Sequence, residues 1–249
     1  MNSSPAVTAA APVRVNDRRR LVLAFWAAAG LSVLLPGLPF GRMALYPFAL
    51  LATWAHEMGH GLTALMVGGE FERLLLFADL GGVAYSARPD NVVAPVLISA
   101  GGLLGPALAG GLVVVLGARA RASRLVLGGL AAALLASAGV WVRNPFGIAA
   151  VLGLGLGCAG MAIYGSEVAR QVATQLIGIQ LCLGSLSDFD YMFTREFVRD
   201  GQVRISDTQA IADQLFLPYW FWGALIAALS LVILAVAFRL AWVPSRRRA

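Results

Sequence analysis

The sequence predicts an all-α polytopic membrane protein with about six to seven transmembrane helices and a short β-hairpin at the membrane surface. Two observations support this fold class. The chain of 249 residues is 59% hydrophobic and 13% charged, with a mean hydropathy of +0.78, whereas a soluble globular domain is nearer half apolar and a quarter charged. The second observation is that the charged residues are clustered and that long uncharged runs lie between the clusters. A membrane protein is therefore favoured over a soluble one.

The uncharged runs mark the expected spans, since a transmembrane helix needs ~20 mostly apolar residues. The run 43–69 is interrupted only by Glu57 and two histidines, and it predicts a helix over about 44–67. The run 171–187 carries glutamine and threonine side chains, which at this depth usually face the interior of a helix bundle. The remaining runs are residues 21–41, 91–118, 125–142, 144–166 and 214–238.

One multi-pass membrane domain is expected over residues 21–240. A tail rich in Ser, Ala and Pro, residues 1–20, precedes it and is expected to be disordered, and a basic tail, residues 241–249, follows it. All 19 basic residues are arginines, and arginine clusters beside spans act as topology signals and contact lipid headgroups. The lipid bilayer is thus an expected partner and nucleic acid is not. Heavy use of Ala, Gly and Leu suggests a bacterial chain, located in the inner membrane.

The arginines leave the orientation in the membrane open. The N-terminal cluster favours a cytoplasmic N-terminus, but seven spans would then place the C-terminal arginines and the loop 119–124 outside, against the positive-inside rule. Either one span is miscounted or residues 36–42 form a re-entrant corner. In any orientation, alternate counting brings the ends of the helices expected at 44–67 and 168–187 to the same side.

Two polar segments interrupt the apolar runs. Residues 70–90 follow the helix-ending pair Gly68-Gly69, and their β-prone pieces around Gly81-Gly82 predict a short hairpin lying at the membrane surface. Residues 191–213 are expected to form a polar loop.

The span after the hairpin is rich in small residues, among them Gly101, Gly102 and Gly105. Small residues at such spacing let helices approach closely. These glycines serve either plain packing or the approach of this helix to a functional site.

The two histidines of the chain lie in the sequence His56-Glu57-Met58-Gly59-His60. On a helix, this spacing places both imidazoles on one face, one turn apart. Zinc accepts imidazole nitrogen, and a catalytic zinc needs a neighbouring acid that takes a proton from its bound water. Glu57 is placed for that task. Because two histidines and a glutamate are costly in an apolar interior unless paired or coordinated, the motif favours a metal site over a chance match.

A catalytic zinc usually has three protein ligands, so a third is needed beside His56 and His60. No other histidine exists in the chain, and an aspartate is the expected donor. Asp188 is the favoured candidate, because it ends the most polar span on the side where the histidine helix ends. Asp190 is the second candidate, and Asp207 is the third, since its loop can fold back.

On these features the chain resembles the site-2 protease family of intramembrane zinc metalloproteases, in particular its small bacterial members without an accessory domain. The resemblance covers roughly residues 43–225. It rests on the histidine motif in a span and the Gly-Gly polar segment after it, and it extends to the stretch Ser99 to Pro106, to Arg143-Asn144 and to Asp188.

The resemblance implies a zinc metalloprotease that hydrolyses a peptide bond in or near a transmembrane segment of another membrane protein. His56 and His60 would hold zinc, Glu57 would activate water, and the 70–90 segment would pair with an extended substrate strand. The chain departs from better-studied members around the third ligand. They carry an Asn-Pro-rich sequence before Leu-Asp-Gly, whereas this chain has Leu186-Ser187-Asp188-Phe189-Asp190.

Two other functions use the same residues. The first is a membrane transporter or relay, in which the buried His, Glu and Asp side chains move protons or metal ions. The chain lacks the internal repeat and paired broken helices that are common in transporters, which disfavours this alternative. The second is a metal-binding scaffold without proteolytic activity. Cleavage that is lost in Glu57→Gln separates the protease from both.

Overall fold

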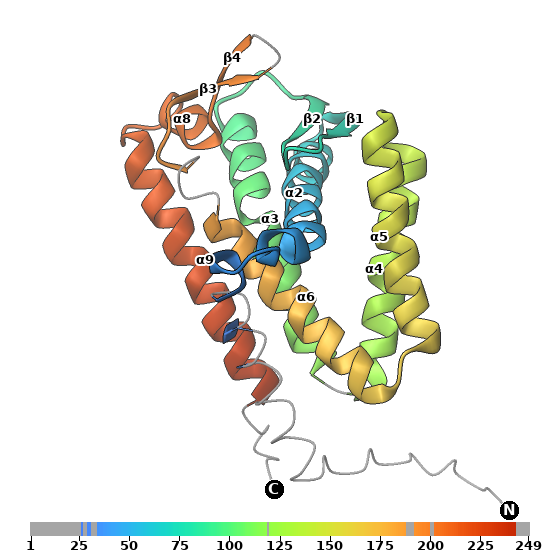
Figure 1. Ribbon diagram of the computed structural model, residues 1–249. Coiled ribbons are helices and arrows are strands. Elements are labelled where there is room, and N and C mark those ends of the chain that lie inside the picture. The colour runs from blue at the N-terminus through green and yellow to red at the C-terminus, as the bar shows by residue number, and fades with distance from the viewer. Residues whose placement is uncertain are drawn as a thin grey trace, which may run out of the picture.

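A computed structural model gives the fold (Figure 1). The part of the chain that it describes is mostly helical and also contains two antiparallel sheets of two strands each, as expected for a helical membrane protein with a hairpin. The tail 1–20, most of the first expected span and residues 243–249 lie outside the described residues. The structure describes residues 26, 29–30, 34–118, 120–187, 192–199 and 202–242.

The elements follow the expected order along the chain. The helices are η1 (Leu35–Gly37), α2 (Gly41–Met66), α3 (Val93–Gly117), α4 (Ala120–Val140), α5 (Pro145–Tyr164), α6 (Glu167–Ser187), α8 (Asp207–Ala212) and α9 (Tyr219–Trp242). The strands are β1 (Glu70–Leu76), β2 (Gly82–Ala87), β3 (Glu196–Arg199) and β4 (Gln202–Ile205).

Fewer helices are apolar enough to cross a membrane than the sequence predicts. Within the described chain there are four, at Val93–Gly117, Ala122–Val140, Pro145–Tyr164 and Tyr219–Ala241. α2 and α6 are long enough, with 26 and 21 residues, but their polar side chains lower their hydropathy. The difference from the seven expected spans therefore has two sources: α2 and α6 carry polar groups, and most of the first expected span lies outside the described residues.

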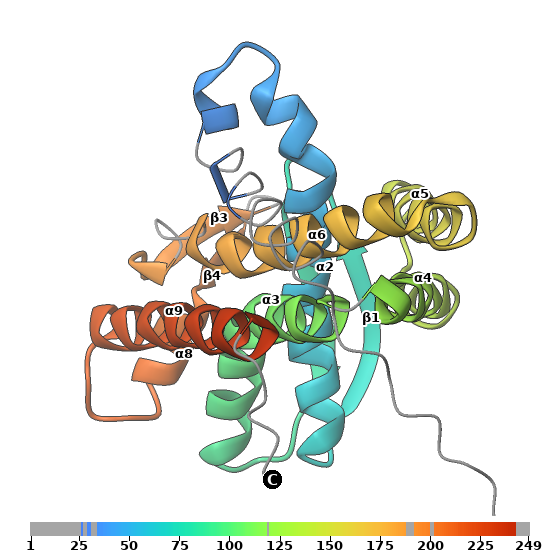
Figure 2. The same ribbon diagram turned by 90° about the horizontal axis from the view of Figure 1, so that it is seen from below.

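α2 runs across the long axes of α4 and α5, which are seen nearly end-on in Figure 2. α3 packs against α2, α6 and α9, and α4 and α5 form a pair beside this group. Both β-hairpins and α8 lie at the end of the molecule where α2 ends and α3 begins (Figure 1). The candidate site lies near this end.

An apolar core joins α2 and β1 to the α4–α5 pair. Trp54, Phe71, Leu74 and Val142 are buried in it. The indole N–H of Trp54 donates a 2.9 Å hydrogen bond to the buried hydroxyl of Ser137, which ties α2 to α4. This core fixes the position of the helix that carries the histidine motif.

The hairpin predicted after that helix is confirmed. β1 and β2 pair antiparallel from Glu70 opposite Ala87 to Leu76 opposite Gly82, with an irregularity between Phe71 and Arg73. Its turn is tied back to α2, because Tyr46 Oη donates to the Ala78 carbonyl at 2.9 Å and Thr53 Oγ1 donates to the Leu80 carbonyl at 2.8 Å. The hairpin therefore lies along α2.

The segment 191–213 holds more structure than the polar loop that the sequence predicts. It contains the second hairpin, β3–β4, and the short helix α8. Met192 and Ile211 from this segment are buried in a second apolar cluster with Leu103 of α3 and Ile226 of α9. This packing folds the segment back against α3.

Candidate metal centre

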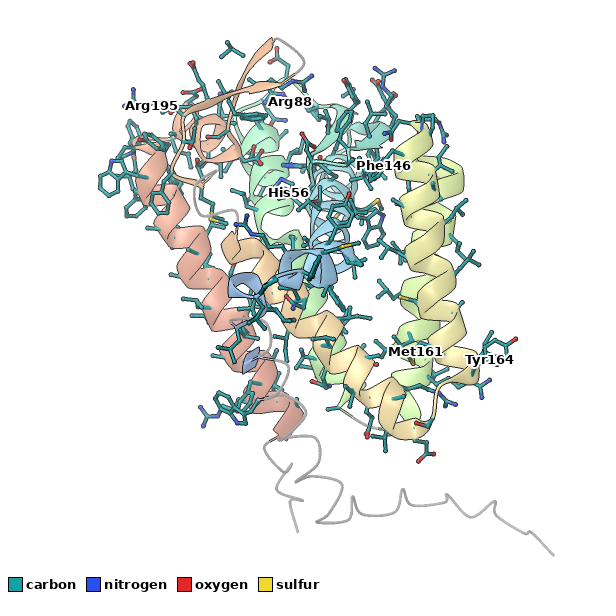
Figure 3. The ribbon with its side chains drawn as sticks, in the orientation of Figure 1. His56, Arg88, Phe146, Met161, Tyr164 and Arg195 are labelled. Carbon is teal, nitrogen blue, oxygen red and sulfur yellow. The ribbon has the colours of Figure 1, made fainter. Side chains whose placement is uncertain are left out.

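His56, His60 and Asp207 bring three donor atoms together. His56 and His60 lie one turn apart on α2, and their Nε2 atoms are 3.0 Å apart. Asp207 Oδ2 is 3.3 Å from the Nε2 atom of each histidine. The site lies between α2, α3 and α8 near the hairpin end of the molecule, where Figure 3 labels His56. The donor atoms lie within 4.8 Å of one another, so one metal ion can contact all three.

α3 fixes the orientation of His60. Its Nδ1 is 2.9 Å from the main-chain carbonyl of Ile98. Because a carbonyl oxygen only accepts, Nδ1 carries a proton in this contact, and Nε2 is the ring nitrogen that faces His56 and Asp207. Metal-binding histidines usually have a partner of this kind on the second ring nitrogen.

Two buried hydroxyl groups hold the loop that carries Asp207. Ser206 caps α8 by accepting from the Gln209 N–H at 3.2 Å, and it donates to the Thr194 carbonyl at 2.6 Å. Thr208 Oγ1 donates to the Met192 carbonyl at 3.0 Å. Asp207 stands between these two anchored residues, so its position is fixed from both sides.

The Asp207 carboxyl is held in its charged form. Burial alone would raise the pKa of this group, but the imidazoles of His60 and His56 outweigh burial and lower its pKa well below the ordinary value. A carboxylate is the form in which an aspartate binds a metal.

Glu57 lies beside the three donors and is cradled by β2. Its side chain is 7% exposed, and its carboxylate accepts a hydrogen bond from the main-chain N–H of Ala84. Gly82 leaves the space for it, because a Cβ at this position would lie 2.6 Å from Glu57 Oε1. The hairpin therefore holds the acid of the motif in place.

The glycines of α3 let this helix approach the site. A Cβ on Gly102 would lie 2.1 Å from Cε1 of His60, and a Cβ on Gly105 would lie 2.7 Å from the carbonyl oxygen of Ala55. These glycines therefore allow close helix packing, and the same packing brings α3 against the ring of His60.

The structure brings together three of the residues that the sequence singled out, His56, Glu57 and His60 on α2, with Asp207, the third candidate for the remaining ligand. Asp188 and Asp190, the first and second candidates for the third ligand, lie outside the described residues. A signal for Asp207 exists in the sequence, because Ser206 and Gln209 have the spacing of a capping box and predict a helix start at 207.

A helical membrane protein with a buried glutamate beside two histidines and an aspartate has the features of a membrane metallopeptidase. The family model described as Peptidase M50B-like matches residues 23–237, and the chain belongs to this family. The match agrees with the resemblance to site-2 proteases and supports protease activity. Comparison with curated proteins and with solved structures gave no match.

Proposed function

We propose that this protein is an intramembrane zinc metalloendopeptidase that hydrolyses a peptide bond in or near a transmembrane segment of another membrane protein. The observation that carries the proposal is the convergence of His56, His60 and Asp207 beside the buried Glu57. The family match supports the coarser statement, a membrane metalloprotease. We also place it in the bacterial inner membrane, on composition alone.

His56 Nε2, His60 Nε2 and Asp207 Oδ2 would hold the zinc ion. Two imidazole nitrogens and one carboxylate oxygen are typical ligands of a catalytic zinc, which leaves a further position open. The bond from His60 to Ile98 supports this assignment, since it leaves Nε2 of His60 to bind the metal. When bound, zinc supplies Lewis-acid chemistry, which acidifies water and polarises a carbonyl group.

Glu57 would act as the general base. Its carboxylate takes a proton from the water that attacks the scissile carbonyl carbon, and it passes a proton to the amide nitrogen as the C–N bond breaks. The Ala84 N–H holds the carboxylate toward β2 and restricts its rotation.

An extended substrate segment would dock on the outer edge of β2. β1 occupies one edge of this strand, and no described strand pairs with the other. Main-chain hydrogen bonds along such an edge bind a peptide largely independently of its sequence. The Ala84 N–H that bonds Glu57 belongs to the same strand, which brings the substrate backbone near the base.

Metal content of the purified protein tests the ligands. We expect about one zinc per chain in the wild type, by elemental mass spectrometry in detergent. Zinc should be lost in His56→Ala and in Asp207→Ala and kept in Asp188→Ala. Zinc that is lost in Asp188→Ala and kept in Asp207→Ala would return the third ligand to Asp188.

Cleavage by Glu57→Gln tests the mechanism. This variant should keep its zinc, because Glu57 is not a ligand, and it should lose cleavage of a reconstituted transmembrane substrate. Normal cleavage by Glu57→Gln would refute the role of Glu57. Proton or metal flux in proteoliposomes that depends on Glu57, without any cleavage product, would instead support the relay.

A further inference from the structure

The connection between α4 and α5 acts as a third strand beside β1. Leu74 of β1 bridges Val142 in parallel orientation. The Leu74 N–H donates to the Trp141 carbonyl at 2.8 Å, and the Arg143 N–H donates to the Leu74 carbonyl at 3.1 Å. β1 therefore has β2 on one edge and this connection on the other.

The side chain of Asn144 extends this pairing where the main chain cannot. In a regular parallel ladder, the next two bonds would join Leu76 to the carbonyl of Arg143 and to the N–H of residue 145. Residue 145 is Pro145, which has no N–H. Asn144 supplies both partners instead. Its Oδ1 accepts from the Leu76 N–H at 3.2 Å, and its Nδ2 donates to the Leu76 carbonyl at 2.5 Å.

Two observations show that the amide of Asn144 is committed to β1. Asn144 is the N-cap residue of α5, yet its side chain makes no capping hydrogen bond there. Gly147 leaves the space that the amide needs, because a Cβ at this glycine would lie 2.4 Å from Asn144 Oδ1. The side chain therefore serves the strand and not the helix that it precedes.

Trp141 holds the other end of β1. Its indole N–H donates to the Phe71 carbonyl at 3.1 Å, and its ring stacks on the Phe71 ring with centroids 4.9 Å apart. Phe71 in turn fills the space over Gly61, the residue after His60. Side-chain hydrogen bonds thus secure both ends of the strand.

The strand pairing leads from Asn144 to Glu57. Leu76, which Asn144 binds, pairs with Gly82, and Gly82 lies against the Glu57 side chain. Leu74 pairs with Ala84, whose N–H bonds the Glu57 carboxylate. A shift of β1 at Leu76 is therefore passed through β2 to the carboxylate.

We propose that Asn144 is a positioning residue for Glu57. It does not touch the substrate, and it acts by fixing β1 so that β2 keeps Gly82 and Ala84 against the carboxylate. The expected effect of Asn144 on turnover rests on the proposed function. The fixing of β1 itself is tested without any activity measurement.

The first test compares Asn144→Ala with the wild type in detergent. We expect kcat to fall by roughly tenfold to a hundredfold, because displacement of a catalytic group by about 1 Å has effects of this size. Zinc content should stay unchanged, since no zinc donor is altered. Hydrogen exchange at the Leu76 and Ala84 amides should be faster than in the wild type.

Asn91→Ala is the matched control. Asn91 caps α3 by accepting from the Val93 and Ala94 N–H groups at 3.0 and 2.8 Å, and neither bond involves β1. This variant loses an asparagine at a helix start but should keep kcat and the exchange rate of Leu76. An equal fall in kcat for both asparagine variants would show a general loss of stability and would overturn the role of Asn144.

A double variant, Asn144→Ala with Pro145→Ala, provides the rescue. It restores a main-chain N–H at residue 145, which can donate to the Leu76 carbonyl as in a regular ladder. We expect part of the lost kcat and of the amide protection to return.

Wild-type kcat together with unchanged exchange at Leu76 in Asn144→Ala would overturn the proposal. A zinc-loaded wild type without cleavage would contradict the proposed function, while the exchange rates would still decide whether Asn144 fixes β1.

Discussion

At the scale of single residues, the candidate centre depends on groups that never contact a metal. Ile98 offers a carbonyl that sets the proton on His60, and Ser206 and Thr208 anchor both sides of Asp207. Ser206 and Thr208 are fully buried, so their hydroxyls have no water to bond if a protein partner is lost. These residues set the geometry of the donors as firmly as the helix does.

Thr208→Val tests this support. The substitution keeps the shape of the side chain but removes the bond to the Met192 carbonyl. We expect zinc affinity to fall about tenfold or more, the usual effect of losing a group that supports a ligand. Competition with a chelator measures the affinity. Thr174→Val is the control, because Thr174 is equally buried on α6 and bonds only within its own helix. An unchanged affinity in Thr208→Val would mean that Asp207 does not depend on this anchor.

At the scale of elements, the site requires a close approach of α2 and α3. The two helices meet backbone to backbone at Gly59 and Gly101, where a Cβ on Gly59 would lie 2.2 Å from the Gly101 oxygen. This approach places the Ile98 carbonyl within reach of His60. Small residues thus determine both the packing of the helix pair and the orientation of a donor.

Gly102→Ala tests the approach. The added methyl group would press on the His60 ring, with 2.1 Å to Cε1. We expect loss of bound zinc and a destabilisation of about 1–3 kcal/mol, as for other overpacked interiors. Thermal unfolding and metal content measure the two effects. Gly128→Ala on α4 is the control, since nothing lies within 4 Å of its added Cβ. Full zinc content in Gly102→Ala would show that the ring can move aside without losing the metal.

The sequence predicted the elements whose signals are local. The pentapeptide from His56 to His60 has helical spacing, and the Gly-Gly pair at 81–82 indicates a hairpin, so both could be located by inspection. The β3–β4 hairpin and α8 were missed, because their strands have four residues each and α8 has six, too few for a periodic pattern. Their position depends on the packing of Met192 and Ile211 against Leu103 of α3, which is distant from them in sequence.

The sequence predicted the site residues that lie on one helix and left open the third ligand, which a second segment of the chain must supply. His56, Glu57 and His60 share a single helix, so their spacing alone brings them together. Asp207 reaches the histidines through a folded segment, and nearness in sequence to the end of a span favoured Asp188 instead. Asn144 was noted in the sequence only as part of the resemblance, without a role, because its importance follows from a strand pairing that the sequence does not show and that Pro145 interrupts.

At the scale of the whole molecule, arginines lie at both ends, since Arg88 and Arg195 are at the hairpin end (Figure 3) and others are at the end opposite the site. Arg124, Arg170 and Arg239 lie near helix ends there, and the Trp26 ring contacts the Phe238 ring at 6.2 Å. In the sequence, the clusters 18–20 and 246–248 adjoin Trp26 and the end of α9. The arginines leave two alternatives, a miscounted span or a re-entrant corner at 36–42, and the course of α2 across α4 and α5 is compatible with the first of them (Figure 2).

We base the orientation on the sequence clusters 18–20 and 246–248, which flank the membrane domain. On these clusters the positive-inside rule predicts that the end opposite the site faces the cytoplasm and that the hairpins face outward. Two exposed residues allow a test of this orientation. Val203 lies on β4 at the hairpin end, and Tyr164 lies at the end of α5, opposite the hairpins (Figure 3). In a chain without its two buried cysteines, a membrane-impermeant maleimide should label Val203→Cys in intact cells. It should label Tyr164→Cys only after permeabilisation. The reverse labelling would place the site on the cytoplasmic side.

The open edge of β2 also has a consequence for inhibition. A short peptide that pairs with this edge but carries a non-hydrolysable bond would compete with substrate through main-chain bonds alone. Methylation of its amide nitrogens on the side facing β2 would abolish binding, and methylation on the opposite side would be tolerated. Selectivity among related proteases would then depend on the few side chains beside the strand, since the backbone bonds are common to any extended peptide.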